Sequence, residues 1–599
     1  MVEKLHLFKR SKTRLPSTPE EQKAGLHVKR VQKIDIAKLK SQMHLLSKER
    51  QHLLSVAMLF IDGTPKSVAL YEWMEENLPR DHAANPPNSV APGADVDQMK
   101  DRGVIRDFPK EQARVFGKHF VVFEDKDIEG HEYRGRRRPI QWTEFLNLLK
   151  DKVLDFLHLD DMEIPNLSQQ LSQMLVFGWA VCFDLSSSFF QIPIHESLQK
   201  FFCTIINGKT YCYTSLPMGF WASCFVMQQI LSALAELATL RSPGPSNCPY
   251  IDNVRFVAKD ECAVRHIGEQ FKLVCDEFRV TLNVEPLNAP HQQGDFLGVH
   301  YDMSDKVFVS LPEAQIEKLK RDEWRLFEPK CNLATMEEVM GRLYWASRVL
   351  ATNTAPFYYA LKFARQRLRA TEEQPIDPMK LIDLWPSVRS AFREWFETLL
   401  KNKPAEVCAS GPSEWILFVD ASKGGYGAIL VNSTTGDTWQ ISGKWPPRMQ
   451  KRAEKATAVR EYLALLIAVE RWLHLFKGQR VTVVEDNTQV LQAAEKGRSP
   501  SYALNKCIEE GAPLLEEFFP KLIYIATELH PADEPSRGRS VDHVKLTNSV
   551  EAIKAGDWDK LLSPARDLTT CNVPAKLSYP LRQRFHIPCA GRHVPVPFA

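Results

Sequence analysis

The sequence predicts a multidomain chain of the α+β class, and three observations lead to this expectation. Its 599 residues correspond to about four domains of ordinary size. The apolar content of 44% is ample for several packed cores. Strand-like apolar runs that end in an acidic residue occur in both halves of the chain, and residues 403–413, rich in proline and glycine, form a predicted linker between the halves.

The first of these runs covers residues 181–194, with the sequence VCFDLSSSFFQIPI. A predicted strand of apolar residues stops at Asp184, and small serines then turn the chain. This pattern places the carboxylate at the edge of a sheet, where a cation can reach it. A purely structural alternative is that Asp184 or Ser186 caps a helix that follows.

A second acid, Asp252, lies in similar surroundings, between the turn-forming residues 243–249 and the apolar residues 254–258. Turn, acid and strand together predict a hairpin tip. Asp184 and Asp252 can converge only if their strands are neighbours in one sheet. Paired there, they would hold two divalent cations about 3.5–4 Å apart, an arrangement that suits phosphoryl and nucleotidyl transfer.

A third segment, residues 215–223 (SLPMGFWAS), forms a predicted turn before a helical run. FDLSSSFFQIPI, LPMGFWAS, YIDN and FLGVHYD follow one another in this order. The series resembles the palm motifs of reverse transcriptases, and four ordered motifs are far more specific than any one of them. The resemblance implies a right-hand polymerase, with fingers and an antiparallel palm sheet in residues 95–304 and a mostly helical thumb or connection in residues 305–402.

The resemblance also implies a polymerase site with two Mg²⁺ ions, or with Mn²⁺ in their place. Asp184, Asp252 and the backbone carbonyl of Leu185 would be the metal ligands, and the ions would activate the primer 3′-hydroxyl and neutralise the triphosphate. Asn253 departs from the pattern, because most reverse transcriptases have a second aspartate at this place. An asparagine cannot carry the charge, which leaves open whether polymerase activity is impaired.

Five residues are implied in nucleotide binding. Arg136 and Arg138, in a basic hairpin, would grip the triphosphate, although a solvated turn that touches template phosphates fits them equally well. Phe189 would reject ribonucleotides by filling the space of a 2′-hydroxyl, with core packing as the alternative. Met218 and Gly219 would line the nucleotide and template pocket, where glycine allows a close backbone approach.

The second half of the chain repeats the pattern of strands and acids. Four carboxylates lie on a predicted strand, helix, strand and turn in this order: Asp420, Glu461, Asp486 and Asp533. The series resembles a ribonuclease H domain with an α/β fold in residues 414–540, and the acidic cluster of that family binds two Mg²⁺ and hydrolyses RNA paired with DNA. The ending HPADEPSR is most similar to that of tyrosine-recombinase retroelements of the DIRS, Ngaro and VIPER-like groups.

The glutamate of this series is ambiguous. Glu454 precedes Glu461 by seven residues, so both would lie on nearly the same face of one helix. The run Arg-Glu-Tyr-Leu-Ala-Leu around Glu461 is the better match to the family, so Glu461 is the predicted ligand.

Composition and the chain ends give weaker predictions. The net charge of +3 is too small to indicate a nucleic-acid partner, so any basic surface is local, as in residues 1–94. One amphipathic helix is predicted for residues 35–60, and the C-terminal tail 541–599 carries no motif. The cysteine spacings exclude zinc knuckles, and no apolar stretch approaches the ~20 residues of a membrane span. We expect an intracellular protein without membrane contact.

Together the motifs predict an RNA-directed DNA polymerase with ribonuclease H activity that copies retroelement RNA into DNA. Its expected partners are an RNA template, a DNA primer, the RNA–DNA hybrid and deoxynucleoside triphosphates (dNTPs). No protease signature or zinc-bearing integrase head is recognised, so a separately encoded recombinase would perform integration. An alternative from a different class is a decayed or domesticated nucleic-acid-binding protein without polymerase activity, which Asn253 favours and the full set of acids opposes.

Overall fold

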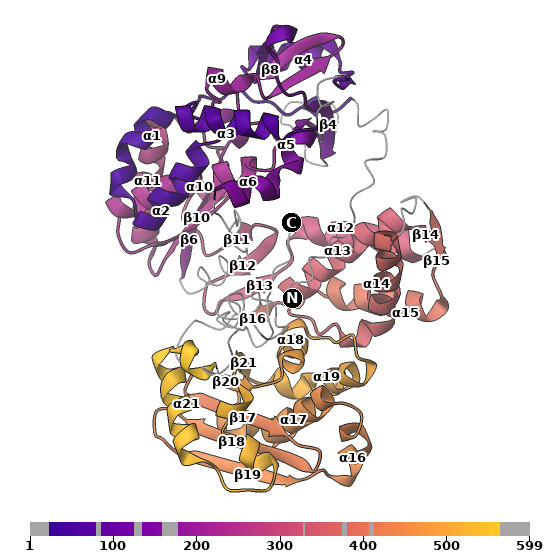
Figure 1. Cartoon of the computed structure of the whole chain (residues 1–599). Helices are drawn as coiled ribbons and strands as arrows, with labels where there is room; N and C mark the ends of the chain where they lie inside the picture. Colours follow the sequence, from indigo (N-terminus) through magenta and orange to yellow (C-terminus); the bar gives the residue numbers. More distant parts are fainter. Residues whose placement is uncertain are drawn as a thin grey trace. The chain divides into compact units, whose positions relative to one another are not determined.

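The computed structural model describes most of the chain in seven segments: residues 23–79, 85–124, 135–157, 178–327, 330–373, 380–406 and 413–562. These residues form two compact units, a first unit up to residue 292 and a second unit from residue 293 onward. In Figure 1 the first unit runs from indigo to magenta and the second continues through pink and orange to yellow. Each unit is built around its own sheets.

The first unit contains a three-stranded antiparallel sheet, called the palm sheet below. Its strands, in spatial order, are β6 (Trp179–Asp184), β10 (Asn253–Ala258) and β9 (Ser246–Tyr250). Strand β10 pairs antiparallel with both neighbours, which confirms the expected antiparallel palm. Most residues of β6 and β10 are buried because two helices pack against the sheet, α10 (Ser223–Arg241) and α11 (Glu261–Glu277) (Figure 1).

Helix α10 is the most apolar element of this unit. Among the described residues it is the one helix whose length and hydropathy would suffice to cross a membrane. However, 78% of that apolar stretch is buried inside the protein, where it packs on β9, α11 and α2 (Lys48–Met58). A helix that is apolar on all sides is equally typical of a domain core, so α10 is accounted for by packing within its own unit.

Two smaller sheets complete the first unit. One contains, in order, β1 (Gly25–Leu26), β5 (Arg136–Trp142) and β4 (Lys118–Glu124). The other contains β2 (Asn88–Ser89), β7 (Cys203–Ile206), β8 (Lys209–Tyr213) and β3 (Ile105–Asp107). The antiparallel pair β4–β5 forms the body of the basic hairpin expected from the sequence, while its tip lies outside the described residues.

The N-terminal region differs from the prediction. The single helix predicted for residues 35–60 is wrong, because the chain forms α1 (Ile36–Gln42), a short 3₁₀ turn and then α2. Leu46 is extended, and the side chain of Ser47 caps α2 by accepting a hydrogen bond from the Arg50 amide. Together with α3 (Pro65–Glu76), these helices share one hydrophobic core with the palm, so the predicted boundary at residue 94 does not separate two cores.

The second unit begins with a small sheet and a group of helices. The sheet contains β11 (Gln293–Phe296), β12 (Val299–Asp302), β13 (Phe308–Ser310) and β16 (Ala405–Glu406). The helices are α12 (Glu313–Phe327), α13 (Leu333–Val349), α14 (Tyr358–Glu373) and α15 (Pro386–Leu400). Residues 405–406 of the predicted linker are therefore part of a strand, and most of the remaining linker lies outside the described residues.

The second unit also contains a five-stranded mixed sheet. Its strands, in order, are β19 (Thr438–Lys444), β18 (Gly425–Asn432), β17 (Trp415–Ala421), β20 (Arg480–Glu485) and β21 (Phe519–Tyr524). Strand β17 pairs parallel with β20, and β20 pairs parallel with β21, whereas β18 runs antiparallel to both of its neighbours, β17 and β19. The order of strands and helices is that of the α/β domain expected from the sequence.

Helices cover both faces of this sheet because successive residues of β17 point to opposite sides. Leu417 and Val419 pack with α17 (Thr457–Phe476) and α19 (Tyr502–Leu515), whereas Ile416 and Phe418 pack with α21 (His543–Ala555). Helix α21 lies beyond the predicted domain end at residue 540. The structure therefore extends this domain into the predicted tail, as far as Leu561.

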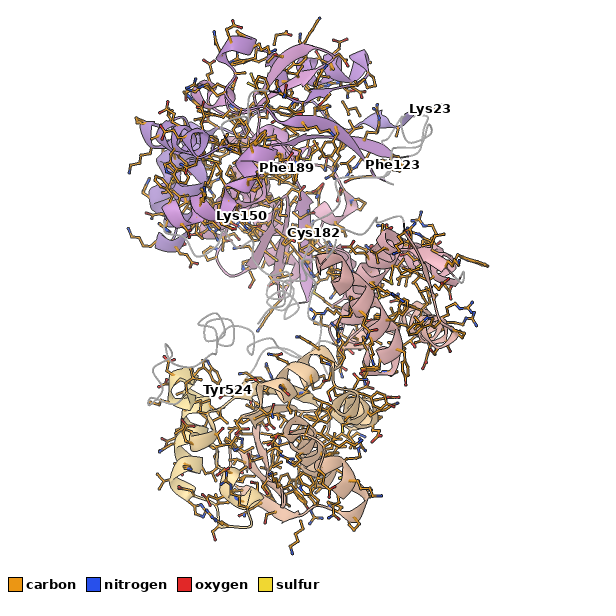
Figure 2. All side chains as sticks on the ribbon, turned by 45° about the vertical axis from the view of Figure 1, so that its right-hand side comes forward. Lys23, Phe123, Lys150, Cys182, Phe189 and Tyr524 are labelled. Carbon is orange, nitrogen blue, oxygen red and sulfur yellow. The ribbon has the colours of Figure 1, made fainter. Side chains whose placement is uncertain are left out.

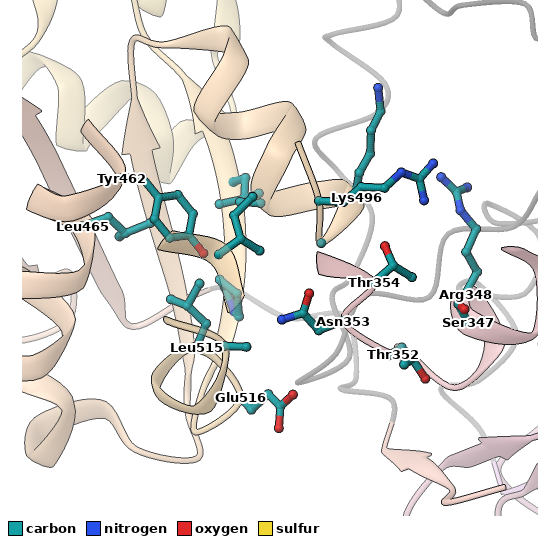
Figure 3. A pocket seen from close by; sticks show the side chains of 18 of the residues that line it. Ser347, Arg348, Thr352, Asn353, Thr354, Tyr462, Leu465, Lys496, Leu515 and Glu516 are labelled. Atoms are coloured by element: carbon teal, nitrogen blue, oxygen red, sulfur yellow. The ribbon is translucent and has the colours of Figure 1, made fainter. Parts of the chain in front are cut away.

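A cavity of about 100 Å³ lies inside the second unit, where the turn after α13 meets the five-stranded domain. Figure 3 shows Tyr462, Leu465 and Leu515 on one side and Asn353 and Thr354 on the other. Next to it, the Asn505 side-chain amide donates a hydrogen bond to the Ala355 carbonyl at 2.7 Å. This contact ties the helical part of the unit to the sheet domain.

Candidate active sites

The palm sheet brings the two acids predicted from the sequence to one end of adjacent strands. Strand β6 ends at Asp184, strand β10 begins just after Asp252, and Asn253 is paired with Asp184 across the ladder. The Leu185 amide donates a hydrogen bond to the Asp252 carbonyl at 2.9 Å. The expectation that the two strands are neighbours is therefore correct, and both acids lie at the same end of the sheet.

The turn that carries Asp252 is held in a conformation that β-branched residues seldom adopt. Ile251 has φ of +55°, in the left-handed region where its Cβ is crowded. Its amide donates to the side-chain oxygen of Gln228, on the buried α10, at 2.7 Å. A bond to a buried helix offsets the strain and fixes the direction in which Asp252 points.

Each palm carboxylate accepts a hydrogen bond from an asparagine amide. Asn283 Nδ2 donates to Asp184 Oδ2 at 2.6 Å, and Asn253 Nδ2 donates to Asp252 Oδ1 at 3.0 Å. Ser188 Oγ donates to Asp252 Oδ2 at 3.3 Å. The capping alternative for Asp184 fails, because the short helix that follows, α8 (Ser188–Gln191), has no side-chain cap.

The electrostatics of the palm edge fit a cation. Burial raises the pKa of Asp252, while the nearby Arg138 guanidinium and the hydrogen bonds from Ser188 and Asn253 lower it. A buried carboxylate with a raised pKa gains from a bound cation, which favours the charged form. Carboxylate oxygens are also the ligands that Mg²⁺ prefers. Asp184 and Asp252 therefore suit a divalent metal.

The two predicted phosphate-binding arginines lie on one face of β5. Arg136 and Arg138 both form ion pairs with Glu124 on the neighbouring strand, at 2.7 and 2.9 Å. Arg137 points to the other face, where it forms a buried ion pair with Asp95 at 2.6 Å. Arg138 is thus the basic residue that connects this hairpin with Asp252, and Arg137 has a structural role.

The other three residues of the predicted nucleotide site lie around the palm core. Phe189 and Met218 are half-buried and pack against that core, and Figure 2 labels Phe189. Gly219 has φ of +113°, and a Cβ there would lie 2.4 Å from the Gln141 carbonyl oxygen. The close approach that requires glycine is therefore made by β5 of the chain itself.

In the second unit, three of the four predicted acids form one cluster. Asp420 is on β17, Glu461 on α17, and Asp486 directly follows β20. One carboxylate oxygen from each lies within 4.8 Å of the others. Asp533, the first residue of α20 (Asp533–Ser536), lines the same cavity of about 490 Å³ and forms an ion pair with Arg537 at 2.7 Å.

The structure separates the two candidate glutamates. Glu454 follows the short helix α16 (Pro447–Ala453) and is exposed, whereas Glu461 is buried on α17. Glu454 lies outside the helix that carries Glu461, so the seven-residue spacing does not place them on one face. Only Glu461 is grouped with Asp420 and Asp486.

In this cluster the carboxylates lie close enough together to raise one another's pKa. Burial raises the pKa of Glu461 far above its usual value, and the carboxylates of Glu485, Asp420 and Asp486 raise it further. Its Oε2 atom is buried and has no hydrogen-bond partner. Burial likewise raises the pKa of Asp420, while His530 opposes the shift. A divalent cation would satisfy these orphaned oxygens, so the residues present fit a metal centre.

Several residues near the two sites were not identified from the sequence. Glu485, the last residue of β20, is fully buried beside Glu461, and its position immediately before Asp486 was the available signal. Asn283 and Lys29 contact the palm site from segments without any motif. Only their position in the fold reveals them.

Comparisons with known proteins agree with this geometry. The family described as reverse transcriptase (RNA-dependent DNA polymerase) matches residues 131–301. The Gag-Pro-Pol polyprotein of human T-cell leukemia virus 2 is 22% identical over 273 residues, which cover 44% of this chain and 16% of the polyprotein. The Gag-Pol polyprotein of walleye dermal sarcoma virus is 33% identical over 82 residues, covering 14% of this chain and 5% of the polyprotein. The chain thus spans a small part of the length of these curated relatives.

Among solved structures, the foamy viral protease-reverse transcriptase in complex with RNA/DNA hybrid is similar, with a TM-score of 0.43 and 14% identity. The similarity covers 83% of this chain and 64% of that one. The matched residues 131–301 contain both palm acids and the strands that carry them. Residues 131–301 are therefore similar to the reverse transcriptase (RNA-dependent DNA polymerase) family, and retroviral Pol polyproteins are among the relatives of the chain.

Proposed function

We propose that the chain is an RNA-directed DNA polymerase with a linked ribonuclease H activity. The observation that carries the polymerase proposal is the convergence of Asp184 and Asp252 on adjacent strands within the matched domain. Its substrates would be an RNA template, a DNA primer and dNTPs. The finer assignment to tyrosine-recombinase retroelements, the separately encoded recombinase and the intracellular location stay predictions from the sequence.

In the palm, Asp184 and Asp252 would hold two Mg²⁺ ions, with the Leu185 carbonyl as a further ligand. Bound Mg²⁺ would supply activation of the primer 3′-hydroxyl and neutralisation of the triphosphate. Arg138 would bind the phosphates, and its electrostatic effect on Asp252 supports this role. Phe189 would pack against the sugar and Met218 against the base.

In the second unit, Asp420, Glu461, Asp486 and Asp533 would hold the metal ions that activate a water molecule against the RNA phosphodiester. The support is the tight grouping of three of these acids together with the raised pKa of Glu461 and Asp420. The 2′-hydroxyl of the RNA strand would distinguish it from DNA.

The decisive test of the polymerase proposal is primer extension on an RNA template with Mg²⁺. The wild-type chain should extend the primer, and Asp184→Asn should not, because one metal ligand loses its charge. Asp155→Asn, an exposed acid on α6 (Lys150–Phe156), is the matched control and should extend normally. Tight hybrid binding by a wild-type chain that never extends the primer would instead support the nucleic-acid-binding alternative.

A further inference from the structure

The segment between β1 and α1 crosses the palm next to its catalytic edge. The Lys29 amide donates to Ser187 Oγ at 3.2 Å, and the Ile34 amide donates to the Gln191 carbonyl at 2.8 Å. The side chain of Lys29 is exposed and donates from Nζ to Asn283 Oδ1 at 3.0 Å. A residue from the beginning of the described chain therefore reaches the loop that contacts Asp184.

Asn283 contacts Asp184 twice. Its backbone amide donates to the Asp184 carbonyl at 2.8 Å, and its side-chain Nδ2 donates to Asp184 Oδ2 at 2.6 Å. The backbone bond fixes the position of the loop beside β6, and the side-chain bond fixes the rotation of the carboxylate. The Asp184 side chain therefore has one oxygen engaged by Asn283.

The chemistry of the three side chains allows one orientation of the Asn283 amide. A lysine ammonium can only donate and an ionised carboxylate can only accept, so an amide between them meets both only with Oδ1 toward Lys29 and Nδ2 toward Asp184. Asp184 and Lys29 select the same orientation, and Lys29 additionally anchors the amide oxygen on the side away from the carboxylate. Without Lys29, Asp184 alone would hold the amide, which would then be less firmly fixed.

We propose that Lys29 and Asn283 are positioning residues for Asp184, and that Lys29 acts through Asn283 rather than through the substrate. The proposal rests on the proposed polymerase function, because it assigns a role to partners of a predicted metal ligand. Hydrogen-bonded partners of metal-binding carboxylates orient the ligand and tune its affinity. Asn253 holds Asp252 in the same way, but without a lysine behind it.

The test measures metal binding directly and does not depend on catalysis. In a full-length background with Asp420→Asn and Glu461→Gln, which removes the second cluster, Mn²⁺ binding is titrated by electron paramagnetic resonance. Asn283→Leu should weaken Mn²⁺ binding about 10- to 100-fold, the usual effect of losing an outer-shell partner. Lys29→Met should weaken it less, by roughly three- to tenfold, since it acts one bond further away. Lys29→Arg should restore most of the affinity.

The double variant tests whether Lys29 acts on Asp184 through Asn283, an arrangement called the relay below, or whether the two residues affect metal binding independently. Lys29→Met combined with Asn283→Leu should bind Mn²⁺ as weakly as Asn283→Leu alone, because the hydrogen bond from the Lys29 side chain leads to Asp184 through Asn283. Additive losses would overturn the relay. So would weaker binding of an RNA–DNA hybrid by Lys29→Met in the absence of metal, because that result would make Lys29 a direct phosphate contact.

Matched controls keep folding effects apart. Lys38→Met removes a neighbouring lysine that pairs with Glu277, and Asn247→Leu removes a palm asparagine that bonds Thr239, so neither should change Mn²⁺ binding. All variants should keep the wild-type unfolding temperature. If the wild-type chain binds Mn²⁺ in the palm but does not extend a primer, the polymerase proposal fails and the relay is still decided by the Mn²⁺ series. If the background and its Asp184→Asn variant bind Mn²⁺ equally well, both the polymerase proposal and the relay are overturned.

Discussion

The two acidic sites differ in how their carboxylates are satisfied. In the palm, Asp184 and Asp252 each accept an amide hydrogen bond, and Arg138 lies near Asp252. In the second unit, Glu461 is buried among other carboxylates and one of its oxygens has no partner. The palm acids are therefore held by amide groups of the protein, whereas Glu461 of the second cluster has a buried oxygen that a metal ion would satisfy.

The largest expected effect concerns the independence of the two sites. Glu461→Gln should lower cleavage of RNA in a hybrid by on the order of a hundredfold or more, because a central carboxylate loses its charge. Primer extension should be unchanged, since the palm uses other acids. Cleavage is measured with a labelled RNA strand paired with DNA.

Glu454→Gln is the matched control for this variant, because it makes the same chemical change on an exposed residue. It should cleave at the wild-type rate. Loss of cleavage in Glu454→Gln but not in Glu461→Gln would move the site away from the cluster and remove the contrast between the two regions.

A second expected effect belongs to the palm alone. Phe189→Val should admit ribonucleotides and reduce discrimination between sugars roughly 10- to 100-fold, because a cavity replaces the ring. The measurement is the ratio of kcat/KM for a deoxynucleotide and the matching ribonucleotide. If the ratio stays at the wild-type value while the unfolding temperature drops, Phe189 has only a packing role.

Without metal, the charge of the second cluster should make stability depend on pH. Glu461 and Asp420 have a higher pKa folded than unfolded, so their neutral form favours folding below the unfolded pKa of about 4. That contribution to stability is lost as the pH rises from the unfolded-state pKa toward the raised pKa that these carboxyl groups have in the folded protein. In EDTA, the unfolding temperature of the second unit should therefore fall by a few degrees between pH 5 and pH 8.

Calorimetry can test this dependence with a direct control. Mg²⁺ should raise the unfolding temperature more at pH 8 than at pH 5, and Glu461→Gln should flatten the pH profile in EDTA. A profile in the variant as steep as in the wild type would show that other groups cause the dependence.

The smallest effect is expected at Asn253. Asn253→Asp should keep or raise primer extension, within about threefold, because it returns a charge beside the metals but loses the amide bond to Asp252. Extension is measured across a Mg²⁺ series. A large loss of activity in a folded variant would show that the amide itself is required.

The sequence predicted the parts of both sites that lie at the ends of apolar strands. Asp184 and Asp252 adjoin two neighbouring strands of the palm sheet, as expected. Asp420 and Asp486 adjoin two strands of the second unit, and their carboxylates lie in one cluster. Strand-borne acids are predictable because the side-chain alternation and the strand end fix where they point.

Residues that depend on long-range packing were beyond this reasoning. Asn283 and Lys29 carry no motif, and the break between α1 and α2 results from a local cap at Ser47 within a helical pattern. Helix α21 was missed because its apolar positions have meaning only against the far face of the five-stranded sheet. For Asn283, Lys29 and α21 a tertiary contact, and not the local pattern, determines the structure.

The path of residues 23–35 across the palm has a consequence for folding. Lys29 bonds Asn283 and the Gln32 amide bonds Thr281, so these contacts close loops of 254 and 249 residues. Contacts of such high sequence separation form slowly, because the entropy of closing the loop is lost before the contact is gained. During synthesis, residues 23–35 must therefore wait for the segment that follows α11, and a fragment beginning at residue 95 would leave part of the palm core uncovered.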